Sequence, residues 1–205
     1  MEKPKIKYAI ILAVTLFLFF PLFAQVKREK DIGSIPSLTA AKGVYQERNF
    51  VSIETNNFTI YYEPDVNLKR VYRKLRARRF YLDAGSKPSA LSGFDEKIAY
   101  RMNLIFEKVK QVLGMYPIGV EFNIKIFKDP KMVYDKYFKI SKKNEKVRSF
   151  YVHAHRTVYI SEATISDSVM AHEMAHAIVN FYFIIKPPET VSEMMAIYVD
   201  SHLED

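Results

Sequence analysis

The sequence of 205 residues contains no cysteine. Disulfide bonds and thiolate metal sites are therefore excluded, and any bound metal ion must be held by nitrogen and oxygen ligands. Apolar residues make up 49% of the chain, enough to bury one hydrophobic core, so we expect one folded domain. The formal net charge is +8, but no recognised nucleic-acid-binding motif accompanies it. We interpret the charge mainly as a property of the surface and expect no nucleic-acid partner.

The first 24 residues have the composition of an export signal. Lys3, Lys5 and Lys7 precede an apolar run from Tyr8 to Ala24, which is the order found in secretory signal peptides. The run of about 17 residues is also at the lower limit for spanning a bilayer, so an uncleaved membrane anchor is the alternative. We expect the rest of the chain outside the cytoplasm, either periplasmic or extracellular, or anchored to the membrane through residues 8–24.

The remainder divides into a linker and a folded domain. Residues 25–48 are polar, with scattered glycine and proline, and predict a linker or loosely packed N-terminal arm; residues 49–205 form the domain. Alternating apolar and polar residues predict three strands, at 50–53, 57–62 and 120–126. Apolar residues at helical spacing predict an amphipathic helix over 95–113, ended by Gly114. A short helix is expected over 131–140.

A strongly basic run lies between Val66 and Asp83, followed by a Ser/Gly/Pro loop from Gly85 to Gly93. Apolar residues at helical spacing accompany the charges, so the favoured interpretation is the solvated face of a helix. A patch for anionic ligands or lipid headgroups is the alternative. The basic residues are Lys69, Arg70, Arg73, Lys74, Arg76, Arg78 and Arg79.

Residues 148–160 alternate like one long strand. Its apolar face carries Phe150, Val152, Ala154, Val158 and Ile160, interrupted by Arg156, and its other face carries Tyr151, His153, His155, Thr157 and Tyr159. The two histidines are interpreted as polar surface, as donors lining a cleft, or as a second metal site, since residues two apart in a strand point the same way.

The most informative stretch is Ser168 to Asn180, which contains the pattern H-E-x-x-H in His172, Glu173 and His176. On a helix, residues four apart lie on one face, so both imidazoles can reach one metal ion. Glu173 lies roughly 100° round the helix, beside the ion, where a carboxylate can take a proton from water. The segment is apolar on nearly every side, which predicts a buried helix whose polar residues need partners or a metal.

Two histidines leave a catalytic zinc site one protein ligand short. A second helix is predicted from Glu189 to Asp200, and Glu193 in its interior is the expected third ligand. Glu189 lies at the start of this helix, where a carboxylate suits the helix dipole. Asp200 shares the face of Glu193 and is predicted either to accept a hydrogen bond from a ligand histidine or to be an exposed polar residue.

The pair of segments His172-Glu-Met-Ala-His176 and Ser192-Glu-Met-Met-Ala-Ile-Tyr198 resembles the gluzincin metallopeptidases, in particular the peptidase-MA-like group. Ser192 stands where that group often has Asn, and Met194 where it often has Gly. The match covers about 35 residues from Ala171 onward, and the region upstream agrees only in layout. The resemblance implies an α+β, zincin-like fold: a mixed sheet packed on an active-site helix, followed by a glutamate-bearing helix.

The resemblance further implies a zinc-dependent peptidase acting on a peptide or protein, with Glu173 as general base. Many gluzincins supply an oxyanion donor from a longer C-terminal region; here the candidates are His155, Tyr182 and Tyr198. Two alternatives stay open: a zinc amidase acting on cell-envelope substrates, and a weakly active or latent zincin that serves as an envelope interaction module.

Overall fold

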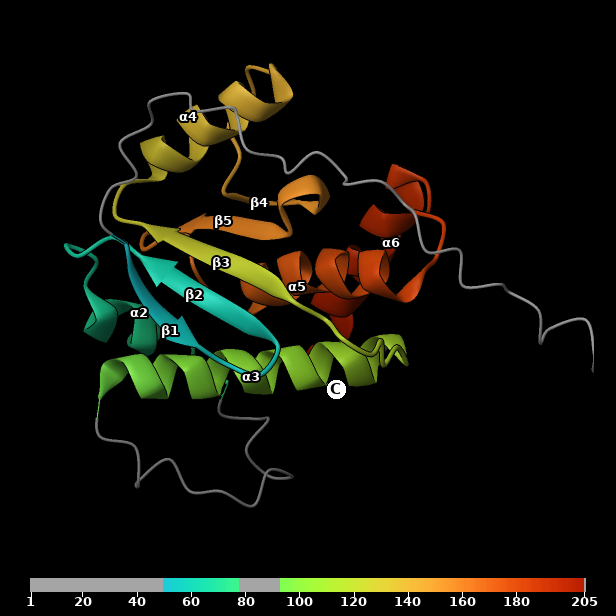
Figure 1. The fold of residues 1–205 in the computed structure, drawn as a ribbon, viewed down its shortest axis with the longest axis horizontal. Helices are drawn as coiled ribbons and strands as arrows, with labels where there is room; N and C mark the ends of the chain where they lie inside the picture. The colour runs from blue at the N-terminus through green and yellow to red at the C-terminus, as the bar shows by residue number, and fades with distance from the viewer. Residues whose placement is uncertain (1–49, 78–92, 205) are drawn as a thin grey trace, which may run out of the picture. The chain divides into compact units, whose positions relative to one another are not determined.

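The computed structural model describes residues 50–77 and 93–204 (Figure 1). The predicted export segment and the N-terminal arm lie outside the described residues, as do Arg78, Arg79 and nearly all of the Ser/Gly/Pro loop. Within the described ranges the chain is an α+β protein with one mixed sheet of five strands and five α-helices. None of the helices in these ranges is both long and apolar enough to cross a membrane.

The sheet has the strand order β1-β2-β3-β5-β4. Strands β2 (Phe58–Tyr62), β3 (Phe122–Phe127) and β5 (Thr157–Ser161) are parallel neighbours. The two edge strands, β1 (Val51–Glu54) and β4 (Ser149–Val152), each run antiparallel to their neighbour. The strands predicted at 50–53, 57–62 and 120–126 are therefore confirmed within two residues at each end.

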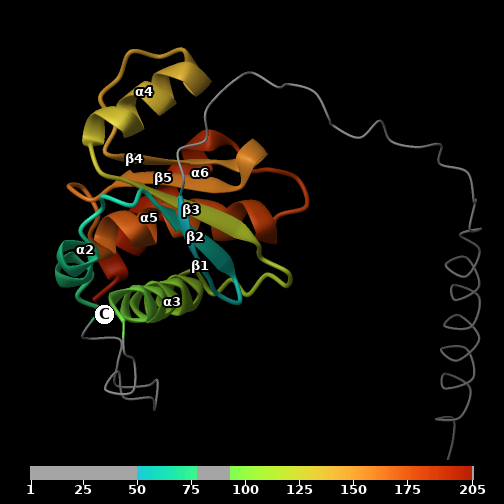
Figure 2. The same ribbon diagram turned by 60° about the vertical axis from the view of Figure 1, so that its left-hand side comes forward.

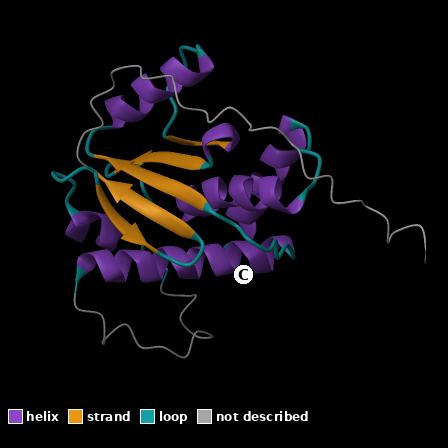
Figure 3. Cartoon of the chain, viewed as in Figure 1, coloured by secondary structure: helices purple, strands orange, loops and turns teal. Residues whose placement is uncertain are grey.

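Helices cover both faces of the sheet (Figures 2 and 3). The main core joins the inner strand residues to helices α2 (Leu68–Lys74), α3 (Phe94–Leu113), α5 (Asp167–Tyr182) and α6 (Glu189–His202). Helix α4 (Pro130–Ser141) covers the opposite face over a smaller cluster of Phe127, Val133 and Tyr159. The sheet thus separates a large apolar layer, which contains α5 and α6, from a thin one.

The amphipathic helix predicted over 95–113 is confirmed by α3. Ile98, Met102, Ile105 and Val109 are fully buried against the sheet and α5. Gly114 then takes the left-handed conformation, with φ of 62°, and its N–H bonds back to the helix carbonyls. Glycine is common after the last helical turn because residues with a side chain disfavour the left-handed conformation.

The helix predicted for the basic run forms, but it ends sooner than expected. Val71 and Leu75 are fully buried, which confirms the apolar face, yet α2 stops at Lys74. The next backbone N–H groups, of Arg76 and Ala77, donate instead to the Asp167 carboxylate at 3.1 and 2.8 Å. The helix therefore ends where the backbone binds Asp167, a residue about 90 positions away in sequence. The local spacing of apolar residues could not indicate this contact.

The single strand predicted over 148–160 is wrong. The chain forms a hairpin: β4, a 3₁₀ turn at His153–His155, and β5. Phe150 pairs with Tyr159 and stacks on it at 4.8 Å between ring centroids, although the continuous strand placed them on opposite faces. Arg156, which interrupts the apolar alternation, has a φ of 45° and ends the turn. That interruption was the available sequence evidence for a turn.

A buried carboxylate ties the ends of the parallel strands together. Glu162, directly after β5, is only 2% exposed; it accepts hydrogen bonds from the Asn67 N–H at 2.8 Å and from Lys128 Nζ at 2.7 Å. Arg70 Nη1 lies 3.4 Å from its other oxygen, so part of the basic run has a structural role. Burial alone would raise the pKa of Glu162, but these hydrogen bonds and charges outweigh it and lower the pKa.

We expect Glu162→Gln to lower the free energy of unfolding by about 1–3 kcal/mol, because charged hydrogen bonds in a buried site are lost. A carboxyl group with a lowered pKa stabilises the fold fully above its unfolded pKa of about 4.5. The difference between wild type and variant should therefore be constant near pH 7 and shrink as the pH falls below that value. Urea unfolding at a series of pH values measures it.

Glu107→Gln is the matched control, since Glu107 is exposed and pairs with Lys110 only one helical turn away. It should change the free energy of unfolding by no more than about 0.5 kcal/mol. Equal effects of the two substitutions would contradict the structural role of Glu162.

Candidate metal centre

Helix α5 carries the H-E-x-x-H segment and is held on nearly all sides by the core. Ser166 caps it, accepting a hydrogen bond from the Val169 N–H at 3.3 Å. Most apolar residues of the helix are buried, which confirms that it is a core helix; the buried ones are Met170, Ala171, Met174, Ala175, Ala177, Ile178 and Val179. Only the face with His172 and His176 opens to a cleft, opposite α6.

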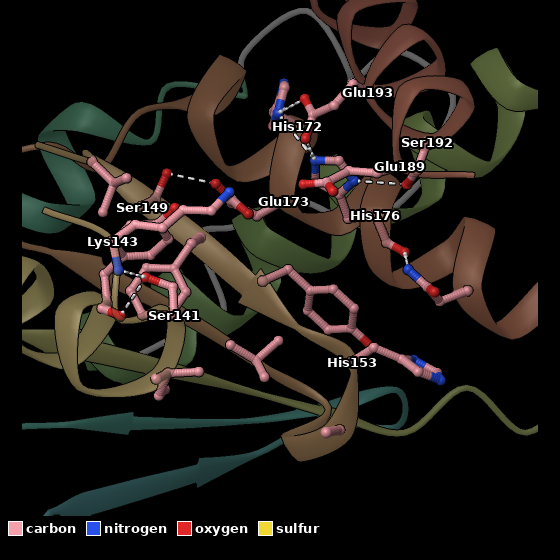
Figure 4. A pocket seen from close by; sticks show the side chains of 18 of the residues that line it. Ser141, Lys143, Ser149, His153, His172, Glu173, His176, Glu189, Ser192 and Glu193 are labelled. Atoms are coloured by element: carbon pink, nitrogen blue, oxygen red, sulfur yellow. Dashed lines mark hydrogen bonds and ion pairs between the residues drawn. The ribbon is translucent and has the colours of Figure 1, made fainter. Parts of the chain in front are cut away.

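His172, His176 and Glu193 converge on one point (Figure 4). The two histidine Nε2 atoms are 3.2 Å apart, and the Glu193 oxygens lie 3.3 Å from His176 Nε2 and 3.6 Å from His172 Nε2. Ligands about 2.0–2.1 Å from a tetrahedral zinc ion are roughly 3.3–3.4 Å apart. The two imidazoles are close to this spacing, and the Glu193 carboxylate approaches each of them with a different oxygen. The three groups are therefore placed so that they could hold one such ion.

Each histidine is fixed through its second ring nitrogen. His172 Nδ1 lies 3.1 Å from Asp200 Oδ2, and His176 Nδ1 lies 2.9 Å from the Ser192 hydroxyl oxygen. Ser168 in turn donates to the other oxygen of Asp200 at 3.3 Å. A proton on Nδ1 leaves the lone pair on Nε2 for a metal ion, which is how such partners orient ligand histidines.

Asp200 is exposed and also lies within hydrogen-bond distance of His172, so it combines the two alternatives predicted for it. The contact of Ser192 was not predicted. Ser192 directly precedes Glu193 and lies on the buried face of α6 with Ala196 and Val199. That placement was the available evidence for its contact with α5. Glu189 is exposed at the first turn of α6 and does not belong to the converging group.

The electrostatic environment favours a neutral His176. Burial lowers its pKa to about 4, with further contributions from the nearby charges of His172 and Lys186. A neutral imidazole is the form that binds metal ions, so this side chain is ready to act as a ligand at neutral pH.

Glu173 has a different environment. It is 5% exposed, and the Ser149 hydroxyl on β4 donates to its Oε1 at 2.7 Å. Burial raises its pKa to about 7, against the lowering effect of the Ser149 hydrogen bond and of His172. Figure 4 shows its carboxylate beside the converging group rather than in it. A carboxyl group in this position can exchange a proton near neutral pH.

A cleft of about 640 Å³ lies in front of these groups. One wall is the sheet-edge strand β4 with the following turn, residues 149–154, and the other is formed by α5 and the start of α6. Tyr137 and Ile140 at the end of α4 close one side. The expectation that residues 148–160 border a cleft thus holds for their first half.

The three candidate oxyanion donors lie elsewhere, since none of them lines this cleft. His155 borders a separate polar hollow of about 370 Å³ with Arg156 and Asn123. Tyr198 stacks on His202 at 4.0 Å, and Tyr182 packs against Phe183. His153 does line the cleft but His155 does not, and no second metal-binding group includes either histidine within the described ranges.

We expect Asp200→Asn to weaken zinc binding about 10- to 100-fold, because an amide is a poorer acceptor for the His172 N–H. Competition with a chromophoric chelator measures the affinity. Asp65→Asn, which changes an exposed turn residue, should leave it unchanged. An Asp200→Asn protein with wild-type zinc affinity would show that Asp200 does not support the site.

Comparisons with protein-family models, with curated proteins and with solved structures found no match to this chain.

Proposed function

We propose that this protein is a zinc-dependent metallopeptidase that hydrolyses peptide bonds outside the cytoplasm. One observation carries the proposal: the donor atoms of His172, His176 and Glu193 lie within 4.8 Å of one another at the wall of a cleft. The buried carboxylate of Glu173 lies beside them. A set of two imidazoles and one carboxylate is typical of catalytic zinc sites, which keep a fourth position open.

The arrangement of elements supports a zincin-like fold. A mixed sheet packs on α5, which carries the H-E-x-x-H segment, and α6 brings Glu193 across to it. This is the order of parts that the resemblance to gluzincins implies. The antiparallel edge strand β4 runs along the cleft, where its free backbone groups can pair with an extended peptide.

In the proposed mechanism, His172, His176 and Glu193 would hold the ion. A bound zinc ion would supply Lewis acidity there, which polarises a carbonyl and makes water more acidic. Glu173 accepts the proton of the attacking water and donates it to the leaving amine. The Ser149 hydrogen bond fixes Glu173 Oε1, so that Oε2 is the oxygen left for the water.

A second candidate function is a metal-binding interaction module with little or no hydrolytic activity. The observation in its favour is that His155, Tyr182 and Tyr198 all lie away from the cleft. Oxyanion donors typically contribute a factor of about 10²–10³ to kcat. The same zinc site without such a donor would hydrolyse peptides slowly.

We expect the purified protein to bind about one zinc per chain, and Glu193→Gln to weaken retention strongly while Glu189→Gln barely changes it. The first substitution removes an anionic ligand, and the second removes an exposed charge one turn earlier on the same helix. Metal analysis after dialysis measures both. Retention lost in Glu189→Gln and kept in Glu193→Gln would show that the ligand assignment is wrong.

Glu173→Gln should retain zinc but lose hydrolysis by about 10²–10⁴-fold in kcat/KM, the usual contribution of a general base. The measurement uses the best substrate from a peptide library, with zinc content determined in the same preparations. Undiminished cleavage by a zinc-loaded Glu173→Gln protein would refute the mechanism. A wild-type protein that binds zinc but cleaves no peptide would favour the interaction module.

A further inference from the structure

Exposed apolar side chains concentrate around one connector. Of twelve large apolar side chains that are exposed in the described ranges, seven lie between residues 182 and 198. Ile184 is fully exposed and Ile185 is 85% exposed, both in the connector between α5 and α6. Figures 1 and 2 show this connector projecting from the body of the fold. Such a concentration marks an interaction surface, whereas single exposed apolar residues are ordinary.

The connector is held in place by its own neighbours. Phe183 packs against the main core and its N–H bonds to the Val179 carbonyl at 3.2 Å. Pro187 and Pro188 restrict the backbone before α6 begins. Ile184 and Ile185 are thus presented by an anchored segment.

The adjoining outer face of α6 extends this surface. Residues three, four and seven apart share a helix face, and one face of α6 is exposed throughout and carries no charged residue. Its members are Thr190, Val191, Met194, Ile197, Tyr198 and Ser201. Glu193 and Glu189 lie at least 100° away from Met194, on the side toward the cleft, and Glu193 borders this face next to Ile197.

We propose that the connector and this outer face of α6 dock on the surface of a lipid bilayer. A projecting apolar tip needs a matching groove on a protein partner, but a bilayer accepts it directly. Lys186 follows the two isoleucines; it is exposed and lines the cleft, where its ammonium group can also reach lipid phosphates. Tyr182 and Tyr198 flank the apolar side chains with amphipathic rings, which favour the membrane interface.

The sequence favours the same partner. The connector and α6 carry one lysine, Lys186, against Glu189, Glu193 and Asp200, so the apolar side chains, and not the net charge of the chain, are what favours docking. The apolar run from Tyr8 to Ala24 is the kind of segment that brings a chain to a membrane. Because Met194 is next to Glu193 on α6, docking would hold the metal centre close to the lipid headgroups.

The test uses the full chain, which has no cysteine, so one introduced thiol can be labelled uniquely. An environment-sensitive NBD fluorophore is attached through Ile184→Cys. Ile118→Cys is the matched control, because Ile118 is also fully exposed but lies in the connection between α3 and β3. Both proteins are added to vesicles of phosphatidylcholine and phosphatidylglycerol, with or without nitroxide-labelled lipid.

We expect the label at position 184 to shift to shorter wavelength and to be quenched several-fold more by nitroxide lipid than the label at 118. If both labels remain equally accessible to aqueous iodide in the presence of vesicles, the proposal is overturned. It is also overturned if the label at 184 shifts without vesicles and the shift grows with protein concentration, since a second copy of the chain then covers the surface. Neither readout depends on zinc or on peptide hydrolysis.

Discussion

The candidate site depends on one constraint: polar side chains must be kept on a helix that is otherwise buried in the core. Unpaired polar groups in such a place destabilise a fold. Here the three polar residues of the H-E-x-x-H segment each have a partner from another element, Ser149 for Glu173, Ser192 for His176 and Asp200 for His172. The packing of α6 and β4 around α5 is therefore what makes the H-E-x-x-H segment compatible with the fold.

The sheet topology explains why a cleft exists at that point. The parallel strands β2, β3 and β5 are buried between helices. Strand β4 runs antiparallel to β5 and forms an edge of the sheet beside α5. The hairpin that creates this edge also directs Ser149 toward Glu173 and turns Phe150 toward the α4 layer. One face of β4 thus forms a wall of the cleft, and the other packs on the smaller core.

Local patterns predicted what local interactions determine. The helix around His172 and His176, the amphipathic α3 and the position of Asp200 on the face of Glu193 follow from side-chain spacing alone. The early end of α2 and the contact of Ser192 with His176 depend on partners 91 and 16 residues distant in sequence. The hairpin depends on the pairing of β4 with β5. Spacing carries no information about such partners, although the interruption at Arg156 hinted at the turn.

Glu173 and Glu193 show how environment separates two identical side chains. Glu193 is half exposed and faces two imidazoles, so its carboxylate is placed where it could join them as a metal ligand. Glu173 is enclosed by the core and by β4, and burial raises its pKa to about 7, where a carboxyl group can both accept and donate a proton. The proposed roles follow from depth: a ligand must reach an ion at the wall of the cleft, and a proton carrier must be shielded enough to hold a proton. Exchanging the two environments would remove the basis for both proposed roles, even with the same residues present.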